Sequence, residues 1–325
     1  GALFHVWNHS LFKSLLFFNA GAVIHAAHTR DMDRLGGLAK QMPRVASLFF
    51  AGAVAISALP PLNGFAGEWL LYLGFFHGLD QSLGKSGAAV GLAAVVLASV
   101  GAMVLACFVK AFGSIFLGSP RSDNVRHIKD PHQSMLIPMM LLTAGCLGLG
   151  LVPMAVAPML EKAIQAWSGS EKLLDKPLLA AFAPLPSISA VGLFFVVIAA
   201  ALIAIAIRLM RANPPRKAPT WDCGYSRTNA RIQYTGTSFV QSLVRLFRFV
   251  LFPKFVDPAL RGFFPGRTQF RMVVIDVVLD RFAVPLFLAS GRLFSSLRIM
   301  QQGHTHLYIM YIVSIVLILM MLGSL

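Results

Sequence analysis

Hydrophobic residues are grouped in long runs along this chain, and stretches rich in polar residues, glycine and proline separate the runs. Several runs exceed the roughly 18 residues that an α-helix needs to cross a bilayer. The pattern predicts an all-α polytopic membrane protein with about six transmembrane helices, one of them broken. The expected spans are residues 1–27, 45–76, 88–117, 134–160, 188–210 and 306–325.

The second run is too long for one straight helix, since it would extend about 48 Å at 1.5 Å per residue. The stretch SALPPLNGF interrupts it, where Pro60 and Pro61 lack backbone donors and Gly64 loosens the turn. Helices broken at membrane depth line protein cavities, and in transporters they mark ion sites. Glu68, about one turn beyond the break, is therefore a candidate site residue; the alternative is a carboxylate that reaches water at a helix end.

A polar, arginine-rich insert separates the fifth and sixth spans. Within it, FVQSLVRLFRFVLF has Arg245 and Arg248 on one side and large apolar residues on the other, which predicts a helix in the headgroup interface. Residues 271–298 carry too many charges for a confident span, so we expect a second interfacial or lateral helix there. We divide the chain into a partial channel repeat (1–120), additional transmembrane helices (121–210), the interfacial insert (211–303) and a terminal span (304–325).

Composition supports the membrane assignment, because 57% of the residues are hydrophobic and only 13% are charged. The net charge of +15 does not indicate nucleic-acid binding, since the basic residues gather in loops beside the spans. The positive-inside rule places those loops in the cytoplasm. The three cysteines are far apart, which argues against a disulfide framework or an iron–sulfur site. We expect no cofactor in this chain. It starts inside a helix already under way, and we interpret it as the C-terminal part of a longer protein.

The first span carries the strongest candidate chemistry. His5, His9 and Lys13 recur every four residues, so they form one stripe that climbs roughly 12 Å along the helix. Ionisable groups at membrane depth are costly and usually functional, and the hypothesis is that these carry protons. Lys110, about 10 Å from its helix end, is interpreted equally as a further proton-transfer residue or as a snorkelling side chain. A final pair of histidines is a helix-end cap or a proton entrance: His25 and His28.

Three alternatives stay open from the residues alone. A sodium/proton antiporter would use oxygen ligands near the break, for which Glu68 and Asn63 are the available side chains. A structural membrane anchor would satisfy its polar groups internally. A metal site at His5 and His9 has chelating spacing but lacks a third ligand nearby in the sequence.

The motifs themselves resemble a known family. FHVWNHSLFKSLLFFNAGAVIHAAHTRDMDRLGGL followed by ALPPLNGFAGEW resembles the second half of the antiporter-like proton-channel subunits of respiratory complex I and Mrp antiporters. This resemblance covers roughly the first 120 residues. TWDCGY, CFVKAFGSIFLGSPRS and QQGHTHLYIMYI are similar to the hydrogenase-4 component B and formate hydrogenlyase subunit 3 group.

The resemblance implies a fold of two inverted five-helix repeats, of which this chain would hold part of the second. It implies that His5, His9 and Lys13 form the central polar axis and that Glu68 is the ionisable residue of the broken helix. It also implies a subunit that carries no redox centre itself within an oxidoreductase complex of the bacterial inner membrane. The expected partners are the lipid bilayer, other membrane subunits and, through them, nickel–iron hydrogenase and iron–sulfur subunits.

Overall fold

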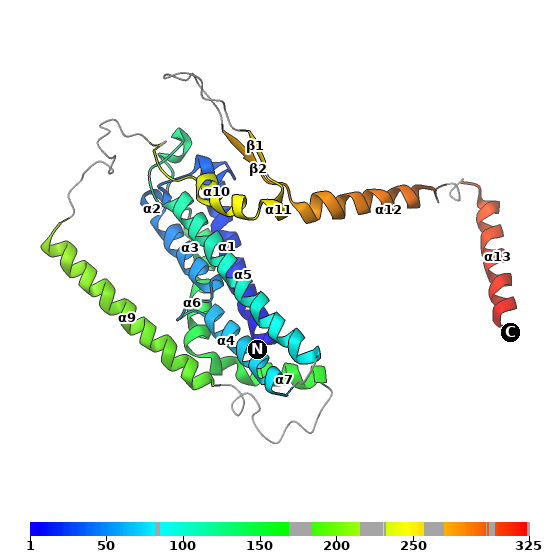
Figure 1. The fold of residues 1–325 in the computed structure, drawn as a ribbon, viewed down its shortest axis with the longest axis horizontal. Helices are drawn as coiled ribbons and strands as arrows, with labels where there is room; N and C mark the ends of the chain where they lie inside the picture. The colour runs from blue at the N-terminus through cyan, green and yellow to red at the C-terminus, as the bar shows by residue number, and fades with distance from the viewer. Residues whose placement is uncertain are drawn as a thin grey trace. The chain divides into compact units, whose positions relative to one another are not determined.

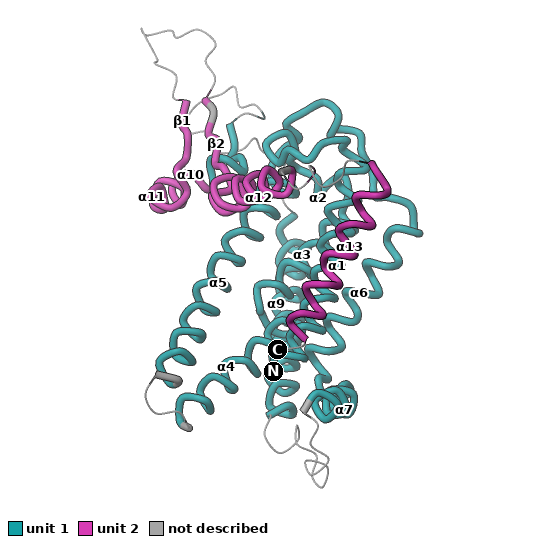
Figure 2. Tube along the Cα trace, turned by 90° about the vertical axis from the view of Figure 1, so that its right-hand side faces the viewer, with its two compact units in different colours: residues 1–239 teal, residues 240–325 magenta. Residues whose placement is uncertain are grey.

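The computed structural model describes residues 1–81, 85–168, 184–214, 230, 232–256, 270–296, 298 and 303–323. These residues are mostly helical (Figure 1), and they form two compact units, Gly1–Phe239 and Val240–Leu325 (Figure 2). The TWDCGY motif lies outside the described residues.

Long helices build the first unit. They are α1 (Ala2–Ala27), α3 (Pro43–Ile56), α4 (Asn63–Gln81), α5 (Lys85–Phe116), α6 (Gln133–Leu151) and α9 (Leu185–Ala212). Helix α1 packs against α3, α4 and α6, whereas α5 packs on α3 and α4, and α9 on α6 (Figure 1). The short elements are η1 (Met32–Arg34), α2 (Leu38–Gln41), η2 (Asp123–Val125), η3 (Pro153–Val156) and α7 (Ala157–Ser168). Helix α1 is at the centre of these helix contacts, and it carries the predicted stripe.

The largest buried apolar cluster lies where α1, α2, α3, α5 and α6 meet. Its fully buried members include Leu15, Leu38, Met42, Phe116 and Met139. This end of the bundle also holds the loops after α1 and α5, and we call it the loop face. Tight packing there fixes the heights of the helices relative to one another, so polar residues on different helices acquire defined levels.

The predicted break in the second span is confirmed, because α3 ends at Ile56 and α4 begins at Asn63. Two glycines allow the broken ends to approach their neighbours. A Cβ at Gly64 would lie 1.8 Å from the carbonyl oxygen of Ala55, and one at Gly150 of α6 would lie 2.1 Å from that of Pro61. The break is therefore enclosed by backbone on two sides, and no larger side chain fits at either glycine.

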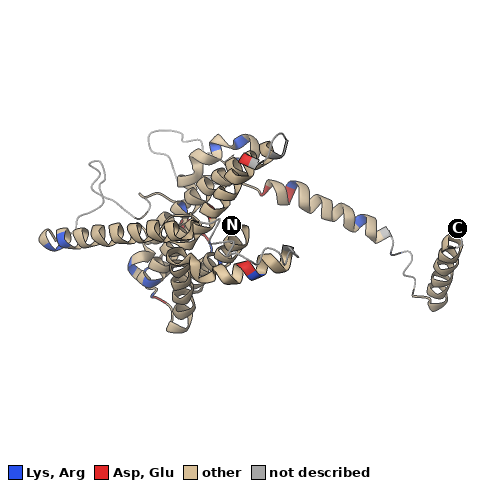
Figure 3. Ribbon diagram, turned by 90° about the horizontal axis from the view of Figure 1, so that it is seen from below, with Lys and Arg blue, Asp and Glu red and all other residues tan. Residues whose placement is uncertain are grey.

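Five helices of the described chain are long and apolar enough to cross a membrane: α1, α5, α6, α9 and α13 (Thr305–Gly323). The broken pair α3–α4 lies where the second span was predicted and is not one of these five. The charged residues of α9 lie near its C-terminal end (Figure 3), where Arg208 and Arg211 follow a long uncharged stretch. The expectation of an all-α polytopic membrane protein is confirmed.

Several predicted boundaries are wrong. The fourth span ends at Leu151 instead of residue 160, because Pro153 lacks a backbone donor and starts η3. Helix α7 then includes residues 161–168, which were expected to be loop. Helix α4 continues to Gln81 and α5 starts at Lys85, so the loop between them is shorter than predicted. Of the cysteines on the apolar helices, Cys107 is exposed and Cys146 is buried.

The second unit contains most of α10 (Gly236–Leu246), followed by α11 (Arg248–Leu251), β1 (Lys254–Val256), β2 (Arg271–Val273), a π-helical turn (Leu279–Ala283), α12 (Val284–Ser296) and α13. Strands β1 and β2 pair antiparallel, with Phe255 opposite Met272. The start of the predicted lateral helix at 271–273 is therefore a strand, whereas its later part is helical as expected. The Arg281 guanidinium lies 4.2 Å from the centre of the Phe252 ring. This cation–π contact links the residue that follows α11 to the π-helical turn.

Candidate functional site: a polar stripe at a helix break

The polar stripe of α1 occupies successive turns of that helix, as the spacing predicted. The ring centroids of His5 and His9 are 6.3 Å apart, and both rings meet the edge or face of Phe12. The ammonium nitrogen of Lys13 lies 5.9 Å from the centre of the Phe17 ring. Aromatic rings thus lie beside each titratable group of the stripe.

Helix α4 crosses α1 at the level of His5. A Cβ at Gly67 would lie 3.0 Å from His5 Nδ1 and 3.1 Å from Asn8 Nδ2, so the two helices approach closely at this glycine. His5 Nδ1 is buried and has no hydrogen-bond partner among the described residues. The crossing therefore leaves one ring nitrogen of the stripe with unused hydrogen-bonding capacity.

Two buried asparagines tie the stripe to the break. Asn8 and Asn63 are both fully buried. The Asn8 amide donates to the carbonyl oxygen of Asn63 at 3.0 Å, and the Asn63 amide donates to the Asn8 side-chain oxygen at 3.2 Å. The sequence reasoning missed Asn8 and considered Asn63 only as a sodium ligand. The sequence did show one asparagine in each of two apolar helices. Amide groups buried in a membrane protein need partners on neighbouring helices, so the two could have been expected to pair.

Glu68 follows Gly67 directly, yet its carboxylate lies on the side of α4 that faces α5. Its Oε2 atom is 3.9 Å from the position that a Cβ would take at Gly101. Tyr72, one turn along α4, is near enough for an electrostatic interaction with it. Within the described residues, Glu68 makes neither a hydrogen bond nor an ion pair. The backbone of α4 at Gly67 and Glu68 therefore lies next to the stripe on α1, whereas the Glu68 carboxylate points toward α5.

Lys110 lies on α5, about 9 Å before the helix ends at Phe116. Its Cε atom is 3.5 Å from the ideal Cβ position of Gly236, and Asp33 Oδ1 is 3.1 Å from the same point. The lysine stem thus extends toward the loop face, where Asp33 lies. This placement agrees with the snorkelling interpretation; a part in proton transfer stays a prediction.

The histidines at the end of α1 are separate from the stripe. His25 and His28 are exposed, and His25 lies about 18 Å beyond Lys13 along the helix axis. His28 has a left-handed backbone (φ +52°) and its N–H donates to the carbonyl oxygen of Ile24 at 2.8 Å. This geometry matches the helix-end cap, and a proton-entrance role stays a prediction.

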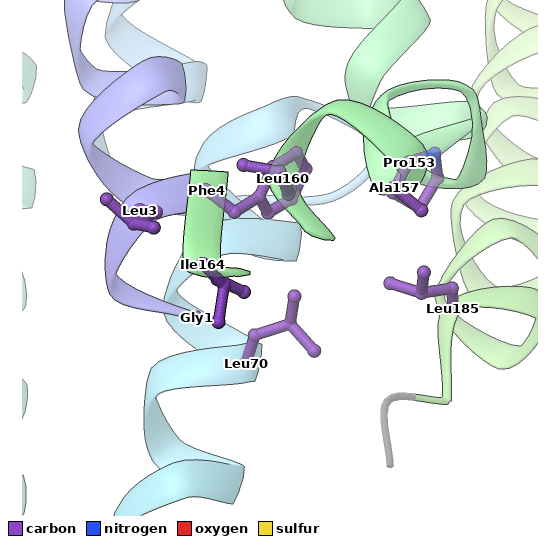
Figure 4. Close-up of a pocket in the computed structure, with 9 residues that line it drawn as sticks. All are labelled: Gly1, Leu3, Phe4, Leu70, Pro153, Ala157, Leu160, Ile164 and Leu185. Atoms are coloured by element: carbon purple, nitrogen blue, oxygen red, sulfur yellow. The ribbon is translucent and has the colours of Figure 1, made fainter. Parts of the chain in front are cut away.

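A small cavity lies beside the first turn of α1 (Figure 4). Its lining is apolar and includes Phe4, Leu70, Leu160 and Leu185, and its volume is about 20 Å³. That volume holds at most a water molecule, and an apolar lining gives such a molecule no partners. The described residues contain no group of three or more His, Cys, Asp or Glu side chains that could hold a metal ion.

Known membrane proteins are similar to this chain in sequence. Residues 1–83 match the family described as NADH:quinone oxidoreductase/Mrp antiporter, TM. Hydrogenase-4 component B of Escherichia coli (strain K12) is 32% identical over 98% of this chain, which covers 49% of that relative. Formate hydrogenlyase subunit 3 of the same organism is 40% identical over 50% of this chain and 27% of the relative. The chain thus spans about half the length of hydrogenase-4 component B.

One solved structure has the same fold over nearly the whole chain. It is described as the membrane-bound sulfane sulfur reductase, an archaeal respiratory membrane complex, and it matches 98% of this chain and 47% of its own with a TM-score of 0.57 and 20% identity. The chain is a multi-pass membrane protein, and its first part is similar to antiporter-like membrane subunits. The similarity extends to hydrogenase-4 component B and formate hydrogenlyase subunit 3, which confirms the resemblance inferred from the motifs.

Proposed function

We propose that this chain forms part of a proton-translocating membrane subunit of a redox-driven complex. The observation that carries the proposal is the stripe of His5, His9 and Lys13, joined through Asn8 and Asn63 to a broken helix. The family match over residues 1–83 covers the same elements. In this proposal protons are relayed among the stripe residues and Glu68, with Lys110 nearer the loop face.

The heights of these residues suit a path across half of the membrane. Along α1, Lys13 lies about 12 Å nearer the loop face than His5. Glu68 lies beside Gly101 of α5, and Lys110 lies about 13 Å nearer the loop face than Gly101. Histidine exchanges protons near neutral pH through two ring nitrogens, so His5 and His9 can accept a proton on one nitrogen and release it from the other. Lysine and glutamate supply charges that switch when a neighbouring charge changes.

The partners in this proposal are the lipid bilayer, other membrane subunits of the complex and, through them, nickel–iron hydrogenase and iron–sulfur subunits. The related hydrogenase-4 component B and formate hydrogenlyase subunit 3 support this choice of complex. The proposed location is the inner membrane of a bacterial cell. Electron transfer would belong to the partner subunits.

Proton transport by the intact complex in inverted membrane vesicles tests the proposal. We expect Lys13→Ala and Glu68→Gln each to reduce transport at least about tenfold, because each removes a charge from the relay. Asp80→Asn is the matched control for Glu68, since it lies at the exposed end of the same helix. Unchanged transport in both variants would refute the proposal. Normal proton transport that depends on sodium would favour the antiporter alternative instead.

A further inference from the structure

Three segments that are far apart in the sequence meet at the loop face of the first unit. They are residues 32–37 after α1, residues 117–122 after α5, and residues 232–237, which lead into α10. We call residues 232–237 the strap. The first two segments contain the LGG and GSPRS sequences, to which the proposed proton path assigns no part.

Arg121 joins all three segments through its guanidinium group. It donates to the carbonyl oxygen of Tyr234 in the strap at 2.6 Å, to that of Ser114 at the end of α5 at 2.8 Å, and to that of Leu35. Burial lowers the pKa of Arg121 and the neighbouring Asp33 opposes this effect, so the group stays charged. Arginine suits this position because its planar fork presents several donors in fixed directions.

Gln233 and Asp33 fix the strap at two further points. The Gln233 side chain accepts from the Ser119 N–H and donates to the Ser119 carbonyl oxygen, both at 3.0 Å. Asp33 accepts from the Thr237 N–H at 3.1 Å and also from the Thr237 hydroxyl. The strap is therefore held by side chains from both loops.

Glycines make this close approach possible. A Cβ at Gly118, which has a φ of +79°, would lie 2.2 Å from the side-chain oxygen of Gln233. A Cβ at Gly36, with a φ of +145°, would lie 2.6 Å from the carbonyl oxygen of Ser119. Both positions need a glycine for backbone conformation and for space.

The strap lies beside Lys110. Gly236 is buried, and a Cβ there would lie 3.5 Å from Lys110 Cε and 3.1 Å from Asp33 Oδ1. The strap backbone is thus next to the half-buried lysine stem where the stem approaches the loop face. Since Gly236 and Thr237 are also the first two residues of α10, a movement of this helix end would move the strap away from Lys110.

We propose that Arg121 is a positioning residue that holds the strap closed over Lys110, and that displacement of α10 uncovers this lysine to the loop face. The inference rests on the proposed function in one respect, which is the part of Lys110 in proton transfer. Gln233 and Asp33 assist Arg121 because they hold the strap on either side of Tyr234. The strap is thus a cover on the loop-facing end of the path.

Accessibility of position 110 tests the cover without relying on transport. Lys110→Cys is introduced into the intact complex with the native cysteines replaced, and a membrane-impermeant thiol reagent is added to inverted vesicles. We expect Arg121→Gln to speed labelling about tenfold, because lost hydrogen bonds make local opening more frequent. Arg126→Gln is the matched control, since within the described ranges Arg126 forms an ion pair with exposed Asp123 alone, at 3.4 Å. Equal labelling rates in the two variants would overturn the proposal.

A reversible disulfide lock provides a second test, which does not depend on the folding of the Arg121 variant. Asp33→Cys together with Thr237→Cys places two thiols where the native side chains touch. We expect the oxidised lock to reduce proton transport at least about fivefold and a reductant to restore it, because a fixed strap keeps Lys110 covered. Full transport with the lock closed would overturn the proposal. Unchanged transport in Lys110→Ala would instead refute the role of this lysine, and the labelling rates would still decide whether Arg121 holds the cover.

Discussion

The enclosure of the helix break predicts a large effect from adding one methyl group at Gly150. In Gly150→Ala the new Cβ would lie 2.1 Å from the carbonyl oxygen of Pro61 and 2.8 Å from the backbone nitrogen of Asn63. Since real Cβ contacts essentially never fall below 3.0 Å, α6 or the break must move by about 1 Å. That movement also displaces Asn63 from Asn8.

The magnitude follows from two costs. Overpacking of a well-packed interior costs about 1–3 kcal/mol. Weakening the buried amide pair, whose hydrogen bonds measure 3.0 and 3.2 Å, adds about 1–3 kcal/mol because its polar groups lose their partners. We therefore expect Gly150→Ala to lower the free energy of unfolding by about 2–6 kcal/mol. Proton transport should fall as well, because the level of Glu68 relative to His5 depends on the break.

The measurement is the melting temperature of the detergent-solubilised complex, together with proton transport in vesicles. Gly148→Ala is the matched control, because it lies on the same helix and a Cβ there would meet no atom within 4 Å. It should be neutral or slightly stabilising, since alanine favours a helix over glycine by about 1 kcal/mol. If Gly150→Ala melted and transported like Gly148→Ala, the inferred enclosure of the break would be refuted.

Three further substitutions test other contacts, with the melting temperature of the complex as the readout. Asn63→Ala should destabilise the protein by about 1–3 kcal/mol because it leaves the fully buried Asn8 without its side-chain partner; the exposed Asn124→Ala should be neutral, and equal effects would contradict the reasoning. Asp130→Ala should cost about 1 kcal/mol, because its carboxylate accepts from two N–H groups in the first turn of α3, both at 3.2 Å, and a wild-type melting temperature would exclude this cap. Gly118→Ala should destabilise the protein by about 1–3 kcal/mol, because residue 118 has a left-handed backbone and the new Cβ would collide with the Gln233 side chain. A stabilising effect would contradict the close contact between Gly118 and the strap.

The candidate site was partly predictable from local patterns. The spacing of His5, His9 and Lys13 placed them on one stripe because the helical repeat is a local property. The break was predictable because Pro60 and Pro61 cannot donate hydrogen bonds within a helix. The pairing of Asn8 with Asn63 was not, since 55 residues separate them and only the packing of α1 on α4 brings them together. The direction of the Glu68 carboxylate likewise depends on which neighbour, α1 or α5, covers each side of α4.

The sequence by itself determined the membrane class, the broken helix and the residues that carry charge within the apolar runs, because hydrophobicity and helical period depend on residues that are close together in the chain. Tertiary structure alone decided which polar groups meet. It placed Gly67 against His5, and it brought Asp33 and Lys110 to the same glycine of the strap. It also explained the glycines that follow α1 and α5, because Gly36 packs against Ser119 and Gly118 packs against Gln233. Such contacts depend on how whole helices pack, and no local pattern encodes that arrangement.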